Sequence, residues 1–363
     1  MRNTHMLKLI FGLATAAVAL ALFLFFYFYR NISRTDGQRA DLENSDGTYE
    51  DETDVEDLMT FRGGEDLTIG EILDAPGEVI GKSSYGTLYR AVFDQSNSLK
   101  LLRFLRPVCV TRSEEFAEVI EILGSVKHPN LVPLLGFYSG PRGEKLMVYP
   151  FYRKWNLAEF IRDGNKNSRR WATIYKISIG IAEGLDHLHT GLMKPIIHGN
   201  LKSKNIFLDH NQHNQQPYVS DFGLHLLLNP MAGQEMLEAS AAEGYKAPEL
   251  IKMKEASADS DIYSLGVILL EMLTGKEPIN GKASSDEEIY LPNYIRRAVL
   301  GRRVSELYHP DILFSNGGGS DDVSVLEARV LKLFHLAMAC CSPSPSLRPT
   351  AKQVRWKLEE IGK

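Results

Sequence analysis

The sequence predicts an α+β fold of two lobes, a β-rich N-lobe followed by a helical C-lobe, behind one N-terminal transmembrane helix. The 363 residues leave room for a large two-lobed domain with flanking segments. Short apolar strands separated by turns fill the first part of the expected domain, and long apolar helices such as DIYSLGVILLEMLTG fill the rest. A long uncharged stretch lies near the N-terminus, from Leu9 to Tyr29.

This uncharged stretch has the length of a membrane span. At helical rise it covers roughly 31 Å, the thickness of a hydrocarbon core. A cleaved signal peptide is the alternative, but its apolar part is usually only about 7–15 residues long and ends in small residues. Here the stretch ends in the bulky aromatic sequence FFYFY, which suits a membrane interface. We therefore expect a short tail at 1–8 and an uncleaved anchor at 9–29.

An acidic segment follows the apolar stretch. Between Asp41 and Asp57 nine of 17 residues are acidic and none is basic. Such a segment buries too little apolar surface to fold, so we expect a flexible juxtamembrane linker over 30–66. An acidic docking segment is the alternative. Periodic structure begins near Leu67, which places the folded domain at 67–363, with lobes at 67–151 and 152–363.

Composition limits the classes of partner and site. The net charge of −5 argues against nucleic acid as the main partner. The three cysteines, Cys109, Cys340 and Cys341, form neither a disulfide framework nor a CxxC metal pair, which implies a reducing compartment. Cys340 and Cys341 lie in the apolar helical run LKLFHLAMACC, so we expect buried structural thiols there. HNQHNQQ, residues 210 to 216, is better explained as a polar turn between two strands than as a histidine metal site.

The segment EVIGKSSYGTLYRAVF, residues 78 to 93, predicts a strand, a glycine-containing turn and a second strand. Glycines in such a turn let backbone amides approach phosphate oxygens with no side chain between them. Gly81 and Gly86 have the outer spacing of GxGxxG, and Ser83 replaces the middle glycine. Hairpin turns of this composition are common, so the motif alone is weak evidence for nucleotide binding.

Further motifs follow in a fixed order. They are HPNLVPLLG, HGNLKSKN at residues 198 to 205, Ser220-Asp221-Phe222-Gly223, Ala247-Pro248-Glu249 and SLRPT. In type and order they resemble a protein kinase domain over about residues 68 to 360. YGTLYRA, HPNLVPLLG and SDIYSLGVILLEMLTGKEP are similar in particular to plant leucine-rich-repeat receptor-like kinases. The resemblance implies a bilobal kinase-like fold that faces the cytosol, in a divergent member without the leucine-rich-repeat ectodomain, because only eight residues precede the anchor.

The resemblance also implies roles for single residues. Asp221 and Asn205 match the ligands of Mg²⁺, and Lys202 matches a lysine near the γ-phosphate of ATP. Tyr149 and Phe151 flank Pro150 in a segment that matches the adenine hinge. A structural group is implied as well, in which Asp261 caps the backbone of the catalytic loop and Glu249 pairs with Arg348. The residues expected to be structural are Phe222, Gly223, Glu249, Asp261 and Arg348.

Other positions depart from the kinase pattern. Arg103 falls where kinases have the strand lysine that binds the α- and β-phosphates; Lys100 fits that place only if the preceding hairpin is shortened. Arginine keeps the charge but is longer and forked, so the exchange is not conservative. Val119 falls where the helix glutamate that pairs with this lysine is expected. Glu118 and Glu121 project about 100° and 200° away from Val119 on the helix.

The largest departure is Asn200, which replaces the catalytic aspartate of the HRD motif. An amide positions a hydroxyl but cannot accept its proton, and general base catalysis is typically worth about 10²–10⁴-fold. Ala242 replaces a threonine that contacts this aspartate in the family. Gly199 replaces an arginine that commonly binds a phosphate on the activation loop, so we expect no switching by phosphorylation there.

These departures predict a receptor-like pseudokinase, anchored by a single pass in a membrane that we expect to be the plasma membrane. It would act in the cytosol as a scaffold or regulator of other receptor-like kinases or signalling proteins, with weak or conditional binding of ATP and Mg²⁺. The alternative is a divergent Ser/Thr kinase that transfers the γ-phosphate of ATP to protein hydroxyls. Phosphotransfer by the purified protein distinguishes the two.

Overall fold

The computed structural model describes residues 56–93, 97–111, 116–152, 156–163, 166–208, 215–253, 255–279, 290–300, 307–313 and 323–363. These belong to one compact unit, Asp54–Lys363. The predicted tail, the predicted anchor at 9–29, most of the acidic segment and most of the turn at 210–216 lie outside the described residues. Within the described ranges, no helix is both long and apolar enough to cross a membrane.

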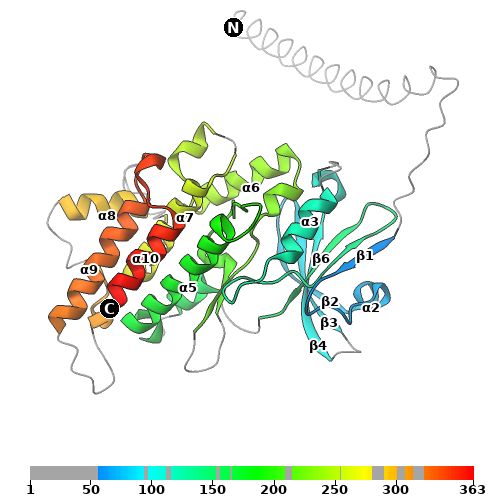
Figure 1. Ribbon diagram of the computed structural model, residues 1–363, viewed down its shortest axis with the longest axis horizontal. Helices are drawn as coiled ribbons and strands as arrows, with labels where there is room; N and C mark the ends of the chain where they lie inside the picture. The colour runs from blue at the N-terminus through cyan, green and yellow to red at the C-terminus, as the bar shows by residue number, and fades with distance from the viewer. Residues whose placement is uncertain are drawn as a thin grey trace, which may run out of the picture. The chain divides into compact units, whose positions relative to one another are not determined.

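The N-lobe is built on a six-stranded antiparallel sheet in the order β1-β5-β6-β4-β3-β2. The strands are β1 Asp57–Thr60, β2 Gly77–Lys82, β3 Gly86–Phe93, β4 Ser98–Leu105, β5 Gly136–Ser139 and β6 Lys145–Pro150. Helices α2 (Ile69–Asp74) and α3 (Phe116–Ser125) lie on opposite sides of this sheet (Figure 1). Neighbouring residues Met147 and Val148 pack into different apolar clusters, since side chains alternate between the faces of a strand.

Ordered structure begins earlier than the boundary expected at Leu67. β1 pairs with β5, Tyr138 donates its hydroxyl hydrogen to Glu56 at 2.9 Å, and the Phe61 amide donates to the Leu135 carbonyl at 2.8 Å. The Phe61 ring packs so closely on α3 that a Cβ at Gly124 would lie 2.2 Å from it. The apolar residues that follow the acidic run therefore extend the sheet, so the expectation of a linker up to residue 66 is wrong for residues 57–60.

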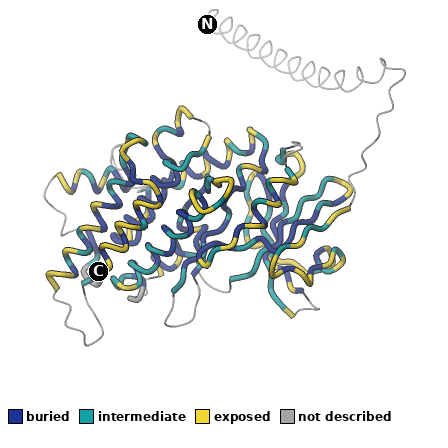
Figure 2. Tube along the Cα trace, in the orientation of Figure 1, coloured by how far each residue is buried: buried dark blue, intermediate teal, exposed yellow. Residues whose placement is uncertain are grey.

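The C-lobe is helical and is centred on α7 (Ala258–Thr274), whose residues from Ser260 to Thr274 are all buried. Figure 2 shows this buried helical interior in dark blue. A capping box formed by Ser257 and Ser260 begins α7, and Gly275 in the left-handed conformation ends it. The other helices are α4 Leu157–Arg162, α5 Trp171–Thr190, α6 Pro230–Ala242, α8 Leu291–Leu300, α9 Val323–Cys340 and α10 Ala351–Gly362. The two-lobed α+β fold predicted from the sequence is confirmed.

Two smaller features complete the C-lobe. The short strands β7 (Ile206–Leu208) and β8 (Pro217–Val219) form a two-stranded sheet directly after the HGNLKSKN segment. Cys340 and Cys341 are free and buried, and burial raises the pKa of both thiols. These two thiols are therefore part of the core, as the apolar sequence around them predicts.

Candidate active site

A cleft of about 590 Å³ is lined by both lobes. Ile80, Leu88 and Leu101 contribute apolar surface from the N-lobe strands, and Phe207 contributes it from β7 in the C-lobe. Charged and polar side chains share the same cleft. Those among the residues singled out from the sequence are Arg103, Lys202, Asn205 and Asp221, with Gly81, Ser83, Gly86 and Phe151 beside them.

The glycine-containing turn closes on itself. The Ser83 amide and hydroxyl both donate to the Gly86 carbonyl, at 2.9 and 3.2 Å. A Cβ at Gly86 would lie 2.3 Å from the Phe104 carbonyl oxygen, so β3 can approach β4 here only with glycine. A Cβ at Gly81 would meet nothing closer than 3.7 Å. Between Ser83 and Gly86, the Tyr85 side chain is buried in the core, and burial raises its pKa.

Arg103 binds Asp221 instead of standing free for a ligand. Its Nη2 donates to both carboxylate oxygens, at 2.8 and 2.7 Å. Burial disfavours the charged guanidinium, but the facing Asp221 carboxylate outweighs it and the pKa of Arg103 is raised. Lys100 lies elsewhere, with its amine over the Phe93 ring, 5.8 Å from the centroid. Of the two basic residues considered for the strand-lysine position, the one in the cleft is therefore Arg103.

Helix α3 presents no carboxylate to Arg103. Val119 is partly buried and packs against the main core. Glu118 forms an exposed ion pair with Lys194 from the C-lobe, and Glu121 is exposed. Asp221 is therefore the acidic partner of Arg103 because α3 supplies none.

The HGNLKSKN loop is held by Asp261 of α7. Its carboxylate accepts from the amides of His198 and Gly199, at 2.7 and 2.9 Å, and pairs with the His189 ring at 2.9 Å. Burial alone would raise the pKa of Asp261, but the bonds from His189 and the charge of the neighbouring rings hold it below its usual value. This anchoring fixes the backbone that carries Asn200.

Asn200 is buried, and its side-chain oxygen Oδ1 has no hydrogen-bond partner among the described residues. Its backbone carbonyl accepts from the Asn205 amide Nδ2 at 3.0 Å. An unpaired amide oxygen can accept a hydrogen bond from a hydroxyl but cannot take its proton at physiological pH. The loop is therefore built like a catalytic loop but lacks a general base at this position.

Lys202 is also paired within the chain. Its amine donates to Glu243 Oε1 at 2.8 Å, and Lys204 lies 2.8 Å from Glu243 Oε2. Burial would raise the pKa of Glu243, but the two lysines hold it below its usual value. Glu243 caps the C-terminus of α6, next to Ala242, so this helix places a carboxylate beside the catalytic loop.

The segment between Asp221 and Glu249 is fixed in place. The Thr111 amide donates to the Leu227 carbonyl at 3.0 Å, and the Asn229 amide donates to the Cys109 carbonyl at 2.8 Å, which holds the segment against the N-lobe beside α3 (Figure 1). Asn229 also caps α6 by accepting from the Ala232 amide at 2.9 Å.

The hydroxyl groups of this segment point inward. Ser240 is buried, and the buried Tyr245 hydroxyl donates to Glu271 Oε2 at 2.6 Å. At Gly199 φ is +77°, and a Cβ would lie 2.5 Å from His225 Nδ1. The segment thus has no accessible phosphate acceptor, and its His225 leaves no room for an arginine at Gly199 in the catalytic loop.

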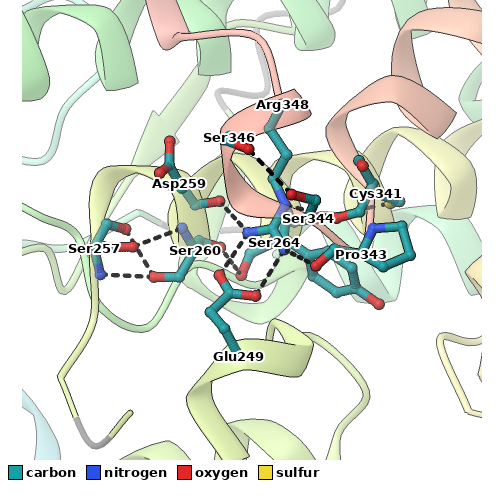
Figure 3. Close-up of polar contacts among 12 residues, drawn as sticks. Glu249, Ser257, Asp259, Ser260, Ser264, Cys341, Pro343, Ser344, Ser346 and Arg348 are labelled. Carbon is teal, nitrogen blue, oxygen red and sulfur yellow. Dashed lines mark hydrogen bonds and ion pairs between the residues drawn. The ribbon is translucent and has the colours of Figure 1, made fainter. Parts of the chain in front are cut away.

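Glu249 and Arg348 form a buried ion pair away from the cleft, shown in Figure 3. Arg348 Nη1 and Nη2 donate to the two carboxylate oxygens at 2.6 and 2.7 Å, and Nη1 also donates to the Asp259 carbonyl at 2.8 Å. The pair joins the end of the Ala247-Pro248-Glu249 segment to the start of α7 and to the turn before α10. Its position indicates a structural role.

The remaining residues singled out from the sequence lie beside this cleft. Phe222 is buried, and Gly223, with φ of +70°, begins a 3₁₀ turn. Tyr149 is half-buried and its hydroxyl donates to Met147 sulfur at 3.5 Å, while Phe151 lines the cleft. Sequence reasoning missed Tyr85 and Glu243. An aromatic residue inside the glycine turn and a glutamate directly before Gly244-Tyr245 were the available signals.

The residues as they stand do not fit a magnesium ion. Mg²⁺ takes carboxylate oxygens at near-octahedral geometry. Both oxygens of Asp221 already accept from Arg103, so the carboxylate expected to ligate the metal is engaged by a cation; Asn205 bonds the loop through its amide nitrogen, which leaves its side-chain oxygen to a ligand. Among the described residues, no cluster of three or more histidine, cysteine, aspartate or glutamate side chains could hold a metal ion.

Comparison with known proteins identifies the family. The protein kinase domain model matches residues 75–357. The putative kinase-like protein TMKL1 of Arabidopsis thaliana is 36% identical over 97% of this chain and 52% of its own length. The probable leucine-rich repeat receptor-like protein kinase IMK3 of the same plant is 37% identical over 84% of this chain and 37% of its own length. The chain spans about half the length, or less, of the curated relatives it matches.

Solved structures agree with this assignment. The maize SIRK1 kinase domain bound to AMP-PNP is 31% identical, with a TM-score of 0.72 over 85% of this chain and 100% of the solved chain. The pseudokinase domain of BIR2, an immune regulator of the RLK/Pelle family, is 27% identical, with a TM-score of 0.67 over 86% of this chain and 91% of its own. The chain therefore belongs to the protein kinase family, and it is similar to plant leucine-rich-repeat receptor-like kinases.

Proposed function

We propose that the chain is a receptor-like pseudokinase, which acts as a cytosolic scaffold or regulator of partner kinases and transfers no phosphate itself. The observation that supports this most is the pairing of Arg103 with Asp221, which occupies the carboxylate that a kinase uses for metal. Asn200 adds a second defect, because it cannot accept a proton. Four of the similar Arabidopsis proteins are described as probable inactive receptor kinases, and the solved BIR2 domain is described as a pseudokinase.

The scaffold role follows from what the fold keeps. The Asp261 anchor, the Glu249–Arg348 pair and the fixed segment around α6 maintain a kinase-like surface without the chemistry. A surface that is kept while the catalytic groups are lost is suited to binding partners. Other receptor-like kinases are the partners proposed, and co-purification of the chain from plant membranes would identify them.

The membrane anchor at 9–29 belongs to the same proposal. It rests on the uncharged sequence from Leu9 to Tyr29 and on the receptor-like relatives. Carbonate extraction of membranes tests it, because an integral protein stays in the pellet at high pH. Release of the intact chain into the supernatant would remove the anchor from the proposal.

A weak Ser/Thr kinase is the second candidate. It is favoured by one observation, that Lys202, Asn205 and Asp221 line a single cleft. The test is phosphotransfer from ATP by the purified full chain with Mg²⁺ and with Mn²⁺, using Asp221→Ala as the background. Transfer equal to that background supports the pseudokinase. Transfer that Asp221→Ala abolishes supports the kinase.

A further inference from the structure

In the cleft, the cationic side chain of Arg103 donates to both oxygens of the Asp221 carboxylate. Both side chains are largely buried, with 9% and 15% of their surfaces exposed. We propose that Arg103 takes the place of a divalent cation, so that the cleft binds a nucleoside phosphate without metal. This rests on the proposed nucleotide cleft, but it does not depend on whether phosphate is transferred.

The first argument concerns what a metal ion would have to displace. To ligate Mg²⁺, Asp221 must release the Arg103 guanidinium. The released guanidinium would remain buried, and α3 offers it Val119 in place of a carboxylate. A buried charge without a partner is strongly unfavourable, so the ion pair resists the metal.

The second argument concerns what Arg103 has left to offer. A guanidinium carries five N–H donors, and the two bonds to Asp221 come from Nη2. Its Nε is buried and has no hydrogen-bond partner among the described residues. An unpaired buried donor beside a cleft is costly unless a ligand oxygen meets it, and phosphate oxygens suit a guanidinium well.

The third argument concerns the charge and shape of the cleft. Basic side chains along its lining outnumber the acidic ones, which are Glu159 and Asp221; the basic residues are Lys82, Arg90, Arg103, Lys202 and Lys204. The exposed Glu78 pairs with Arg90, and Glu243 is shared by Lys202 and Lys204, so an excess of positive charge remains. Another part of the lining is apolar, with Ile80, Leu88, Leu101 and Phe207. A flat base with a phosphate tail matches both parts.

The experiment measures the Kd of the purified full chain for ATP by calorimetry, once with EDTA and once with excess Mg²⁺. We expect the two values to agree within about threefold, since the metal adds no contact at Asp221. Tightening by Mg²⁺ of about tenfold or more would show that the metal displaces Arg103 and would overturn the proposal. Absence of ATP binding under both conditions would also overturn it, while leaving the proposed lack of phosphotransfer intact.

Variants separate the role of Arg103 from general charge. Arg103→Met removes the guanidinium and frees Asp221, so binding in EDTA should weaken by about tenfold or more, and Mg²⁺ should now restore part of it. Arg90→Met is the matched control, since it also removes an arginine from the cleft lining but leaves the Asp221 pair in place. It should keep the same Kd ratio between EDTA and Mg²⁺ as the unmodified chain. A metal dependence equal in both variants would contradict the assignment to Arg103.

If Arg103→Met does not fold by circular dichroism, Arg103→Lys replaces it in the same comparison. Lysine keeps the charge but is more compact than the guanidinium fork, so it cannot reproduce its set of hydrogen bonds. For Arg103→Lys, the ratio of the Kd for ATP in EDTA to the Kd in Mg²⁺ should lie between the ratio of the unmodified chain and the ratio expected for Arg103→Met. Metal-independent binding unchanged in Arg103→Lys would mean that a guanidinium is not required.

Discussion

Arg103 and Asp221 are separated by 118 positions in the sequence, and one nitrogen of the arginine meets both oxygens of the aspartate. In the kinase pattern these two positions hold a phosphate-binding lysine and a metal ligand. Here each neutralises the other. The cleft of this chain therefore differs from a kinase cleft in two ways: arginine replaces the lysine, and this arginine forms an ion pair with the aspartate.

Gly199 is predicted to be required by packing. Its φ of +77° and the approach of His225 Nδ1, 2.5 Å from a built Cβ, leave no room for a side chain. Gly199→Ala should lower the free energy of unfolding by about 1–3 kcal/mol. Chemical denaturation measures it. Gly233→Ala on α6, where a Cβ meets nothing within 4 Å, is the control and should be neutral or stabilising. Equal effects of the two substitutions would show that Gly199 is not constrained.

The Glu249–Arg348 pair is predicted to support the C-lobe. The Arg348 side chain is 0% exposed, so Arg348→Met leaves a buried carboxylate without its partner and should cost about 3–5 kcal/mol. Arg142→Met is the control, because Arg142 is 88% exposed and pairs with Glu144 at the surface. That variant should leave the free energy of unfolding nearly unchanged, because solvent screens the surface pair. Adding Glu249→Gln to Arg348→Met should recover part of the loss, and a strictly additive result would argue against a coupled pair.

The start of the folded unit is predicted to lie before β1. A chain beginning at Asp54 keeps the β1–β5 pairing and Phe61, whereas a chain beginning at Arg62 loses both. The shorter chain should melt lower by on the order of 5 °C or more. Thermal melts followed by circular dichroism compare the two. Equal melting temperatures would show that β1 and Phe61 add no stability, and the folded unit would then begin near Leu67, as the sequence indicated.

Glu271 is predicted to make stability depend on pH. Burial raises the pKa of Glu271 to about 7, although the bond from Tyr245 opposes this. The pKa in the folded state lies above the ordinary value of 4.5, so protonated Glu271 stabilises the folded state. This stabilisation is complete at low pH and is lost as the pH rises through about 7. Between about pH 5 and about pH 8, the stability of the unmodified chain relative to Glu271→Gln should fall by on the order of 1–3 kcal/mol.

Urea denaturation across this range measures the effect. The exposed Glu255→Gln serves as the control, and the same comparison with it should stay flat. A flat comparison for Glu271→Gln as well would show that Glu271 is charged throughout the range. A rise in the relative stability of the unmodified chain with pH would mean that the partners of Glu271 stabilise its carboxylate more than burial disfavours it.

The architecture was predictable because the kinase-like motifs occur in a fixed order and the elements between them follow local patterns. Glycine turns, strand alternation and the apolar run from Asp261 to Gly275 are each recognisable within a few residues. β1 was missed because its strand of four residues begins inside an acidic run whose composition predicts a linker. Helix α6 was not predicted either, because its apolar periodicity is weak. Asn229 and Pro230 at its start are typical of a helix N-terminus, but they are equally typical of a turn.

The contacts of the site could not be predicted in the same way. The sequence indicated that Arg103, Asn200 and Val119 are unusual, but it did not indicate which side chain the Arg103 guanidinium would pair with. That choice depends on α3 presenting Val119 and on Asp221 lying within reach, and both are properties of the packed lobes. The Lys202–Glu243 bond likewise requires the end of α6 to lie beside the catalytic loop.

The central claim is that Arg103 and Asn200 together remove phosphotransfer. Its most direct test is the rate of phosphate transfer from ATP with Mg²⁺, measured side by side for the unmodified full chain and for Arg103→Lys/Val119→Glu/Asn200→Asp. The triple variant gives the lysine a carboxylate on α3, frees Asp221 for metal and restores the general base. The account predicts no transfer above the Asp221→Ala background by the unmodified chain, and transfer by the triple variant at least about 10²-fold above that background. Transfer by the unmodified chain that Asp221→Ala abolishes, or a folded, nucleotide-binding triple variant that remains inactive, would contradict it.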